Sequence, residues 1–68
     1  MGRCFKVGLR RGDPDAAVYF VAESDPTQAL GILQAELPKD GLDFDDRGPV
    51  TRHLIDALDL KPGQYCRV

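Results

Sequence analysis

The sequence predicts an α+β domain in which a small antiparallel sheet carries two helices. Three observations lead to this fold class. Residues 3–10 alternate apolar and polar side chains, residues 17–22 are β-branched, aromatic or small, and residues 26–37 place leucines at helical spacing. Turn-forming residues separate these segments. The 68 residues suit one small domain, and we take residues 1–68 as that domain.

Residues 3–10 and 17–22 are the first two expected strands. Between them, residues 11–15 (RGDPD) are dense in turn formers, which predicts a β-hairpin. Side chains alternate between the faces of a strand, so each strand has one face toward the helices. We assign to that face Phe5, Val7, Leu9, Val18, Phe20 and Ala22. The opposite, open face then carries Cys4, Lys6, Gly8, Arg10, Ala17, Tyr19 and Val21.

The first helix has clear start and stop signals. Asp25 is a good N-cap, Pro26 suits the first helical position, and Gln28 is placed to bond back to the cap. Pro38 ends the helix because it disfavours helical backbone in the residue before it. The apolar stripe expected on the sheet is Pro26, Ala29, Leu30, Leu33 and Leu37. Ile32 points away from this stripe and needs a cover from this chain or another.

The second half of the chain predicts an acidic loop, a shorter helix and a last strand. Residues 39–48 form the loop, with Leu42 and Phe44 turned inward. Pro49 opens the second helix, and Pro62-Gly63 ends it. Its apolar stripe is Val50, Leu54, Ala57 and Leu58, with Ile55 at the edge. Residues 64–68 then form a third strand beside the first, giving β-β-α-α-β, strand order 2-1-3, with both helices on one sheet face.

Charge and composition restrict the compartment and the partners. The net charge is −2, yet residues 1–12 carry +4 and the rest of the chain carries −6. No apolar run approaches the roughly 20 residues of a membrane span, which argues against a membrane partner. The N-terminal segment lacks the apolar stretch of a signal peptide, so we expect a cytoplasmic protein with reduced Cys4 and Cys66.

The residues that most often carry chemistry are few and scattered. His53 is the only histidine, and Asp56 lies one helical turn beyond it, but neither is tied to Ser24, the only serine. Cys4 and Cys66 lack the short spacing of a zinc site, and the acidic loop fails the calcium-loop template. We therefore predict no catalytic residue, metal or cofactor. A thiol-dependent enzyme is left as a further alternative.

The open sheet face is the expected functional surface. We predict a non-enzymatic interaction or regulatory module that self-associates there, as a homodimer for example, or binds another protein. The residues assigned to this interface are Lys6, Arg10, Tyr19, Val21 and Ile32. The alternative is nucleic-acid binding, in which basic residues hold phosphates and a ring stacks on a base. That site would use Arg3, Lys6, Arg10, Arg11 and Tyr19, although the acidic pI of about 5.1 argues against it.

Overall fold

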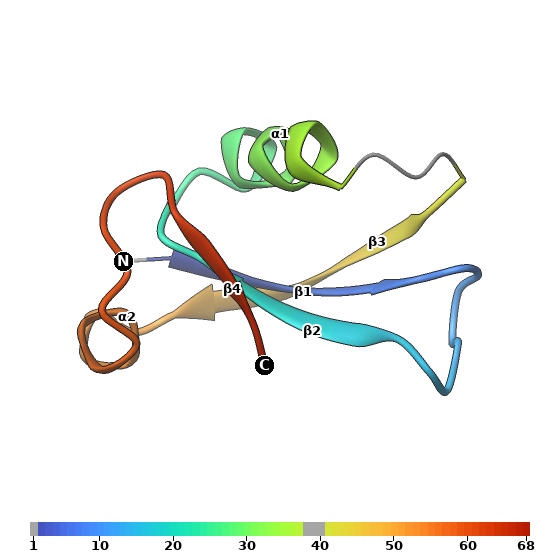
Figure 1. The fold of residues 1–68 in the computed structure, drawn as a ribbon, viewed down its shortest axis with the longest axis horizontal. Coiled ribbons are helices and arrows are strands. Elements are labelled where there is room, and N and C mark those ends of the chain that lie inside the picture. The colour runs from blue at the N-terminus through green and yellow to red at the C-terminus, as the bar shows by residue number, and fades with distance from the viewer. Residues whose placement is uncertain (1, 38–40) are drawn as a thin grey trace.

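The chain forms one antiparallel sheet with a helix on each of its faces. The computed structural model describes residues 2–37 and 41–68. Its elements are β1 (Gly2–Gly8), β2 (Ala17–Val21), α1 (Pro26–Glu36), β3 (Asp43–Val50), α2 (Arg52–Ala57) and β4 (Tyr65–Arg67). The strands lie in the order β3-β1-β2-β4, with α1 above the sheet and α2 below one end of it (Figure 1). The predicted α+β class with one antiparallel sheet and two helices is confirmed.

The hairpin between β1 and β2 forms where the turn residues lie. The Asp13 carboxylate accepts hydrogen bonds from the backbone N–H groups of Leu9 and Asp15, both at 2.9 Å. This side-chain cap replaces strand pairing, so β1 ends at Gly8 and the connection spans residues 9–16. Leu9, expected on the buried face of a longer strand, is consequently 60% exposed.

Helix α1 begins where the sequence predicts. The Asp25 side chain accepts from the backbone N–H groups of Thr27 and Gln28, and Pro26 is the first helical residue. The bond back to the cap comes from a different residue than expected, because the N–H of Asp25 donates to Glu23 Oε1 at 3.1 Å. The helix extends to Glu36, with Leu37 as its C-cap; the predicted stop, Pro38, lies outside the described residues.

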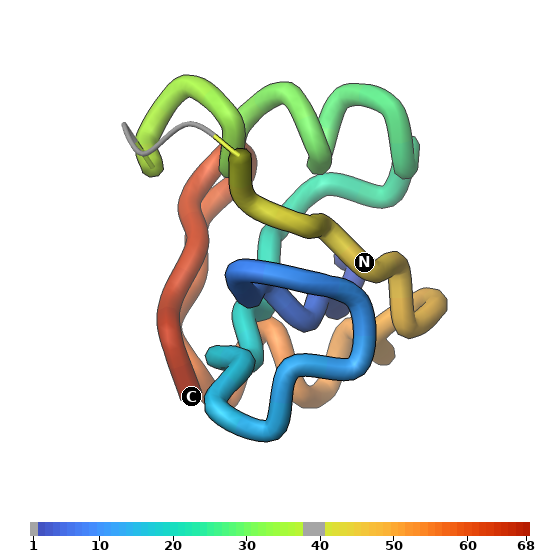
Figure 2. Tube along the Cα trace, turned by 90° about the vertical axis from the view of Figure 1, so that its right-hand side faces the viewer, coloured from blue at the N-terminus to red at the C-terminus, as the bar shows by residue number. Residues whose placement is uncertain are grey.

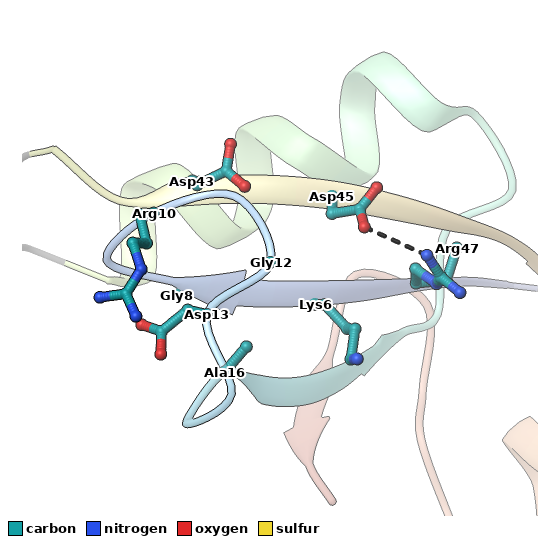
Figure 3. A pocket seen from close by; sticks show the side chains of 9 residues that line it. All are labelled: Lys6, Gly8, Arg10, Gly12, Asp13, Ala16, Asp43, Asp45 and Arg47. Carbon is teal, nitrogen blue, oxygen red and sulfur yellow. Dashed lines mark hydrogen bonds and ion pairs between the residues drawn. The ribbon is translucent and has the colours of Figure 1, made fainter.

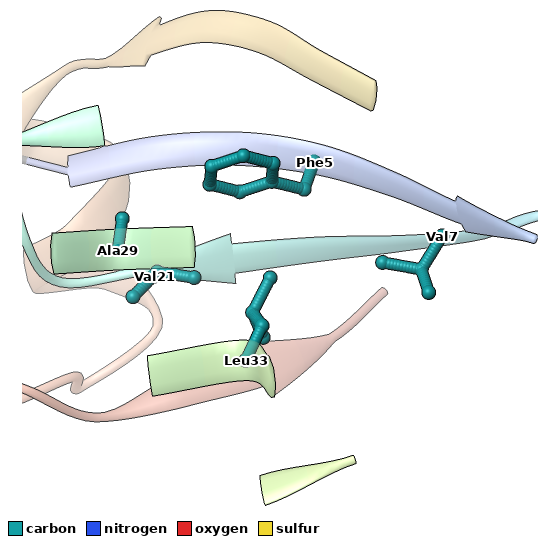
Figure 4. Close-up of a cluster of buried hydrophobic side chains, with 5 residues drawn as sticks. All are labelled: Phe5, Val7, Val21, Ala29 and Leu33. Carbon is teal, nitrogen blue, oxygen red and sulfur yellow. The ribbon is translucent and has the colours of Figure 1, made fainter. Parts of the chain in front are cut away.

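Helix α1 lies over one face of the sheet (Figure 2), and it contributes to the larger of the two buried clusters. The side chains of Ala29 and Leu33 are fully buried against the sheet. Figure 4 shows this cluster, whose buried members are Phe5, Val7, Val21, Ala29 and Leu33. Ile32, expected on the outer side of the helix, is half-buried and packs against the same cluster. Its cover therefore comes from this chain.

The faces of β2 are the reverse of those predicted. Phe5 pairs with Tyr19, and Arg3 pairs with Val21. Directly paired residues share a sheet face, so Tyr19 and Val21 lie on the α1 side with Phe5. Val18, Phe20 and Ala22 consequently lie on the opposite face, beside Cys4 and Lys6. Both sides of this strand are apolar, so its alternation does not decide which side meets the helix.

Residues 43–48 of the predicted acidic loop belong to an edge strand, which corrects both the strand count and the strand order; residues 39–40 of that loop lie outside the described residues. Residues 43–50 pair with β1 along its whole length, with a bulge between Cys4 and Phe5. Phe44 packs against the core beneath α1, and Val50 is buried on the other face. Because β3 occupies this side of β1, the last strand pairs with β2 instead. Its observed bounds are Tyr65–Arg67, within the expected 64–68.

The second helix is shorter than predicted and packs on the other sheet face. Its N-cap is Thr51, whose hydroxyl accepts from the N–H of Leu54, so Pro49 belongs to β3 instead of the helix. Ile55 is the buried residue, packed with Ala22 and Val50 in a second cluster. The expected stripe is rotated, because Leu54 and Leu58 are 37% and 36% exposed. The prediction of two helices on one face is therefore wrong.

Candidate functional site

On the sheet face opposite α1, the described residues place a helix over one end only. We call this face the α2 face, because α2 packs over Ala22 and Val50 at that end. Next to this end, Cys4, Phe20 and Cys66 lie side by side across three strands, since Phe20 pairs with both cysteines, and Cys4 and Phe20 pack against the cluster beneath α2. These side chains are half-buried, as is Val18, the next residue of β2 on this face. We define the open patch as Cys4, Val18, Phe20, Cys66 and Val68.

The two cysteines share this face but do not touch. Phe20 stands between Cys4 and Cys66, one strand from each. Strands are spaced about 4.8 Å apart, so the two Cα atoms lie about 10 Å from each other, beyond the roughly 7 Å that a disulfide spans. Both thiols are free. Burial raises the pKa of the Cys4 thiol, and the nearby Arg47 offsets part of that rise. Cys4 is therefore a packing residue in a thiol state at neutral pH.

A small charged cleft adjoins the open patch toward the hairpin (Figure 3). Its volume is about 130 Å³. The cleft lies between β1, β3 and the β1–β2 connection, and Lys6 lies beside Asp45 because these residues pair across the strands. We define the charged cleft by its lining residues, Lys6, Gly8, Arg10, Gly12, Asp13, Ala16, Asp43, Asp45 and Arg47.

The charges of this cleft balance. Three cationic side chains face three carboxylates within it. Arg47 Nη1 and Asp45 Oδ2 form an ion pair at 3.2 Å. The hydrogen bonds that Asp13 accepts from the backbone of Leu9 and Asp15 hold its pKa below the usual range, and Arg10 adds to that effect. The cleft therefore presents alternating charges of both signs instead of a positive surface.

The structure brings together only some of the predicted interface residues. Lys6 and Arg10 both line the charged cleft, as expected for neighbours on one surface. Tyr19 and Val21 instead lie on the α1 face, so the expected grouping of all four is wrong. Val21 is 0% exposed, and the Tyr19 ring lies 5.9 Å from that of Tyr65, centroid to centroid.

The remaining basic residues of the predicted nucleic-acid site are also separated. Arg3 lies on the α1 face and pairs with Asp46 at 2.8 Å. Arg11 lies in the β1–β2 connection and lines a shallow hollow with Phe44 and two aspartates of β3. The five residues therefore do not form one basic surface with a stacking ring, and the predicted grouping is wrong.

Sequence reasoning missed the residues that occupy the α2 face where Tyr19 and Val21 are predicted. The sequence pattern predicts Val18 and Phe20 on the buried side, and it predicts Asp45 and Arg47 in a loop. Their signal is present in the alternation of residues 17–22, yet it fixes only that Val18 and Phe20 share a face. Cys66 joins them through the pairing of β4 with β2.

The side chains considered for catalysis remain apart. His53 is exposed on α2, and Ser24 is exposed between β2 and α1. Within residues 2–37 and 41–68, no three histidine, cysteine or acidic side chains are grouped as a metal site would require. Neither described helix has the length and apolarity needed to cross a bilayer. The α2 face thus combines an apolar patch with neighbouring charges of both signs.

No protein-family model, curated protein sequence or solved structure matches this chain.

Proposed function

We propose that this protein is a small non-enzymatic interaction module that self-associates through its α2 face. One observation carries the proposal. Cys4 and Phe20 pack against the cluster beneath α2, and the half-buried Cys66 and Val18 and the exposed Val68 continue this apolar surface away from the helix. Small domains gain stability when such apolar surface is buried by association. Two free thiols on this surface fit a reducing compartment such as the cytoplasm.

A second copy is the partner that the charges favour. A symmetric dimer buries the same surface of both subunits, so that surface must complement itself. The charged cleft next to the open patch meets this condition, because Lys6 and Arg47 lie among Asp43 and Asp45. A twofold arrangement brings cations of one copy toward carboxylates of the other. Such rim charges mainly set orientation and association rate, while the apolar centre supplies affinity.

Analytical ultracentrifugation over a wide concentration range tests this proposal. Val18→Lys places a charge within the open patch and should shift the equilibrium to monomer. Gln34→Lys adds the same charge on the exposed side of α1, over the opposite sheet face, and should leave association unchanged. A wild-type protein that stays monomeric at millimolar concentration refutes self-association. Equal dissociation of both variants would assign the effect to net charge instead of the patch.

Nucleic-acid binding is the alternative partner class proposed for the basic residues. Lys6 and Arg10 are close enough to contact one phosphate backbone, but Asp13, Asp43 and Asp45 lie in the same cleft. Binding driven by phosphates weakens steeply with salt, and each lost contact lowers that slope by about one. A salt-dependent affinity for random single-stranded RNA that disappears in a Lys6→Ala, Arg10→Ala double variant would favour this alternative.

A further inference from the structure

Strand β4 has a free edge with regularly placed backbone groups. The N–H of Val68 donates to the carbonyl of Val18 at 2.8 Å, and the N–H of Ala22 donates to the carbonyl of Gln64 at 2.8 Å. In an antiparallel ladder, alternate residues bond to the same neighbour. Residues 64, 66 and 68 therefore face β2, and Tyr65 and Arg67 direct their N–H and C=O groups outward. No described residue pairs with β4 on that side.

The other edge of the sheet is unsuited to pairing. Strand β3 is bulged opposite Cys4 and Phe5, and Gly48 has a φ of 105° there. Pro49 offers no N–H, and the Asp46 carboxylate binds the N–H of Gly48 at 2.8 Å. Bulges, proline and charges are the devices that keep sheet edges from pairing. Strand β4 carries neither a bulge nor a proline, and Arg67 is its single charged residue, so its outward backbone groups are the more open to another strand.

We propose that two copies of this chain join their β4 strands edge to edge, antiparallel, about a twofold axis at Cys66. This register puts Tyr65 of each copy opposite Arg67 of the other. Both residues direct backbone groups outward, so the two pairs form four main-chain hydrogen bonds. It also places each Tyr65 ring on the same face as the guanidinium of the opposing Arg67, within reach of a cation–π contact. The edge complements itself in this register.

The joined edges extend the open patch across both copies. Cys66 and Val68 lie on the α2 face at the outer strand, and Val18 and Phe20 lie one strand inward. A twofold axis perpendicular to the sheet keeps the two α2 faces on the same side. The two patches then become one apolar surface over the shared strands. Edge pairing leaves the joined patch exposed, so it is a contact between copies separate from the burial of the α2 face. It rests on the proposed self-association only in that both require two copies to meet.

Cys66 reports on this register directly. At the axis, the two Cys66 residues form a non-hydrogen-bonded pair, whose Cα atoms lie about 4.5 Å apart. That separation is within the range a disulfide accepts. In a Cys4→Ser variant, diamide should therefore join two chains through Cys66, taking up the two hydrogens as the disulfide forms. A Cys66→Ser variant, which keeps Cys4, should give at least tenfold less covalent dimer at the same protein concentration.

Two variants of Arg67 separate the contribution of its backbone N–H to dimerisation from that of its side chain. Arg67→Pro removes an outward N–H that β2 does not use, whereas Arg67→Ala keeps that N–H and removes the same charge. We expect Arg67→Pro to abolish dimerisation and Arg67→Ala to weaken it by a few-fold at most. Should the proline variant fail to fold, amide hydrogen exchange of the wild type decides instead. Protection of the Tyr65 and Arg67 amides should rise with protein concentration.

The outcomes distinguish this inference from the broader proposal. A dimer whose Cys66 residues do not cross-link, and whose Tyr65 and Arg67 amides exchange equally at all concentrations, refutes edge pairing and leaves self-association through the patch standing. A wild-type monomer at millimolar concentration refutes both. Rapid cross-linking through Cys66, loss of the dimer in Arg67→Pro and concentration-dependent protection together support the edge-paired dimer.

Discussion

Arg3 and Asp46 are joined across the bulge between β1 and β3, where Arg3 Nη2 donates to Asp46 Oδ2 at 2.8 Å. The other oxygen of this carboxylate, Oδ1, accepts from the backbone N–H of Gly48 at 2.8 Å. One side chain thus fixes the bulge and ties the edge strand to the central strand. The hydrogen bond from Arg3, followed by that from Gly48, holds the pKa of Asp46 below its usual range.

Because of the Asp46 carboxylate, the free energy of unfolding should depend on pH in the acid range. A depressed pKa in the folded state means that Asp46 contributes stability above its unfolded pKa of about 3.9, and that the contribution is lost as pH falls through the lower folded value. Asp46→Asn should cost about 1 kcal/mol or less at pH 7, because the pair is partly exposed. Urea unfolding at pH 7 and at pH 2–3 should show that cost shrinking.

The matched control for this prediction is Asp15→Asn, at an exposed position of the β1–β2 connection. Its stability should follow that of the wild type at both pH values. If Asp46→Asn loses as much stability at pH 2 as at pH 7, the effect does not come from the ionised carboxylate.

Leu33→Ala should be among the most damaging single changes in α1. Leu33 is 0% exposed and packs against Phe5 and Val21 at the centre of the core. Removing such a side chain costs about 2–5 kcal/mol, a large share of the 3–10 kcal/mol or so expected for a chain of this length. Thermal unfolding measures the loss. Gln34→Ala, at the next and exposed position, should change stability by less than about 0.5 kcal/mol.

Two glycine-to-alanine changes should act in opposite directions. A Cβ at Gly2 would meet the carbonyl oxygen of Val21 and lie 2.7 Å from Ile55 Cδ1, so Gly2→Ala should destabilise by about 1–3 kcal/mol. A Cβ at Gly31 would meet nothing within 4 Å on the exposed side of α1. Gly31→Ala should therefore stabilise by about 0.5–1 kcal/mol, through helix propensity and a less flexible unfolded chain. Equal shifts in urea midpoint would contradict the packing at Gly2.

Cys4 should react slowly with iodoacetamide at neutral pH. The thiolate is the reacting form, and burial raises the pKa of this thiol. In a Cys66→Ser variant, the alkylation rate should rise close to tenfold per unit between pH 7 and pH 8, and it should continue to rise at pH 9. The same variant in urea, with Cys4 exposed, should level off near its ordinary pKa of about 8.5. A folded rate equal to the unfolded rate at pH 7 would overturn this assignment.

The parts of the fold that the sequence predicts are those with strong local signals. Asp25 followed by Pro26 fixes the start of α1, because the cap depends on neighbours in the chain. Phe5 and Val7 fix the buried side of β1, because polar residues alternate with them. The positions of Ala29 and Leu33 on the sheet follow from helical spacing alone.

The errors arise where the signal depends on distant partners. The two sides of β2 are equally apolar, with Ala17, Tyr19 and Val21 on one side and Val18, Phe20 and Ala22 on the other. The sequence alone therefore does not show which side meets α1, and the prediction has the two faces of this strand exchanged. Residues 43–50 contain three aspartates, a glycine and a proline, which strands usually avoid. They form a strand because β1 supplies the pairing and an edge position leaves their charges in solvent. The candidate site differs from the predicted one for the same two reasons. The orientation of β2 places Phe20 on the α2 face, and the pairing of residues 43–50 with β1 places Asp45 there.

The central position of β1 in the sheet determines when the domain can fold during synthesis. β1 is made first and gains β2 through a nearby hairpin, but its contacts with β3 join residues about 35–48 positions apart. Such distant pairings slow folding because a long loop must close before they form. When only the hairpin and α1 have emerged from the ribosome, the nascent chain therefore exposes the edge of β1 that later pairs with β3. Until residue 50 has emerged from the ribosome, that unpaired strand edge is the part of the chain most open to aggregation or chaperone binding.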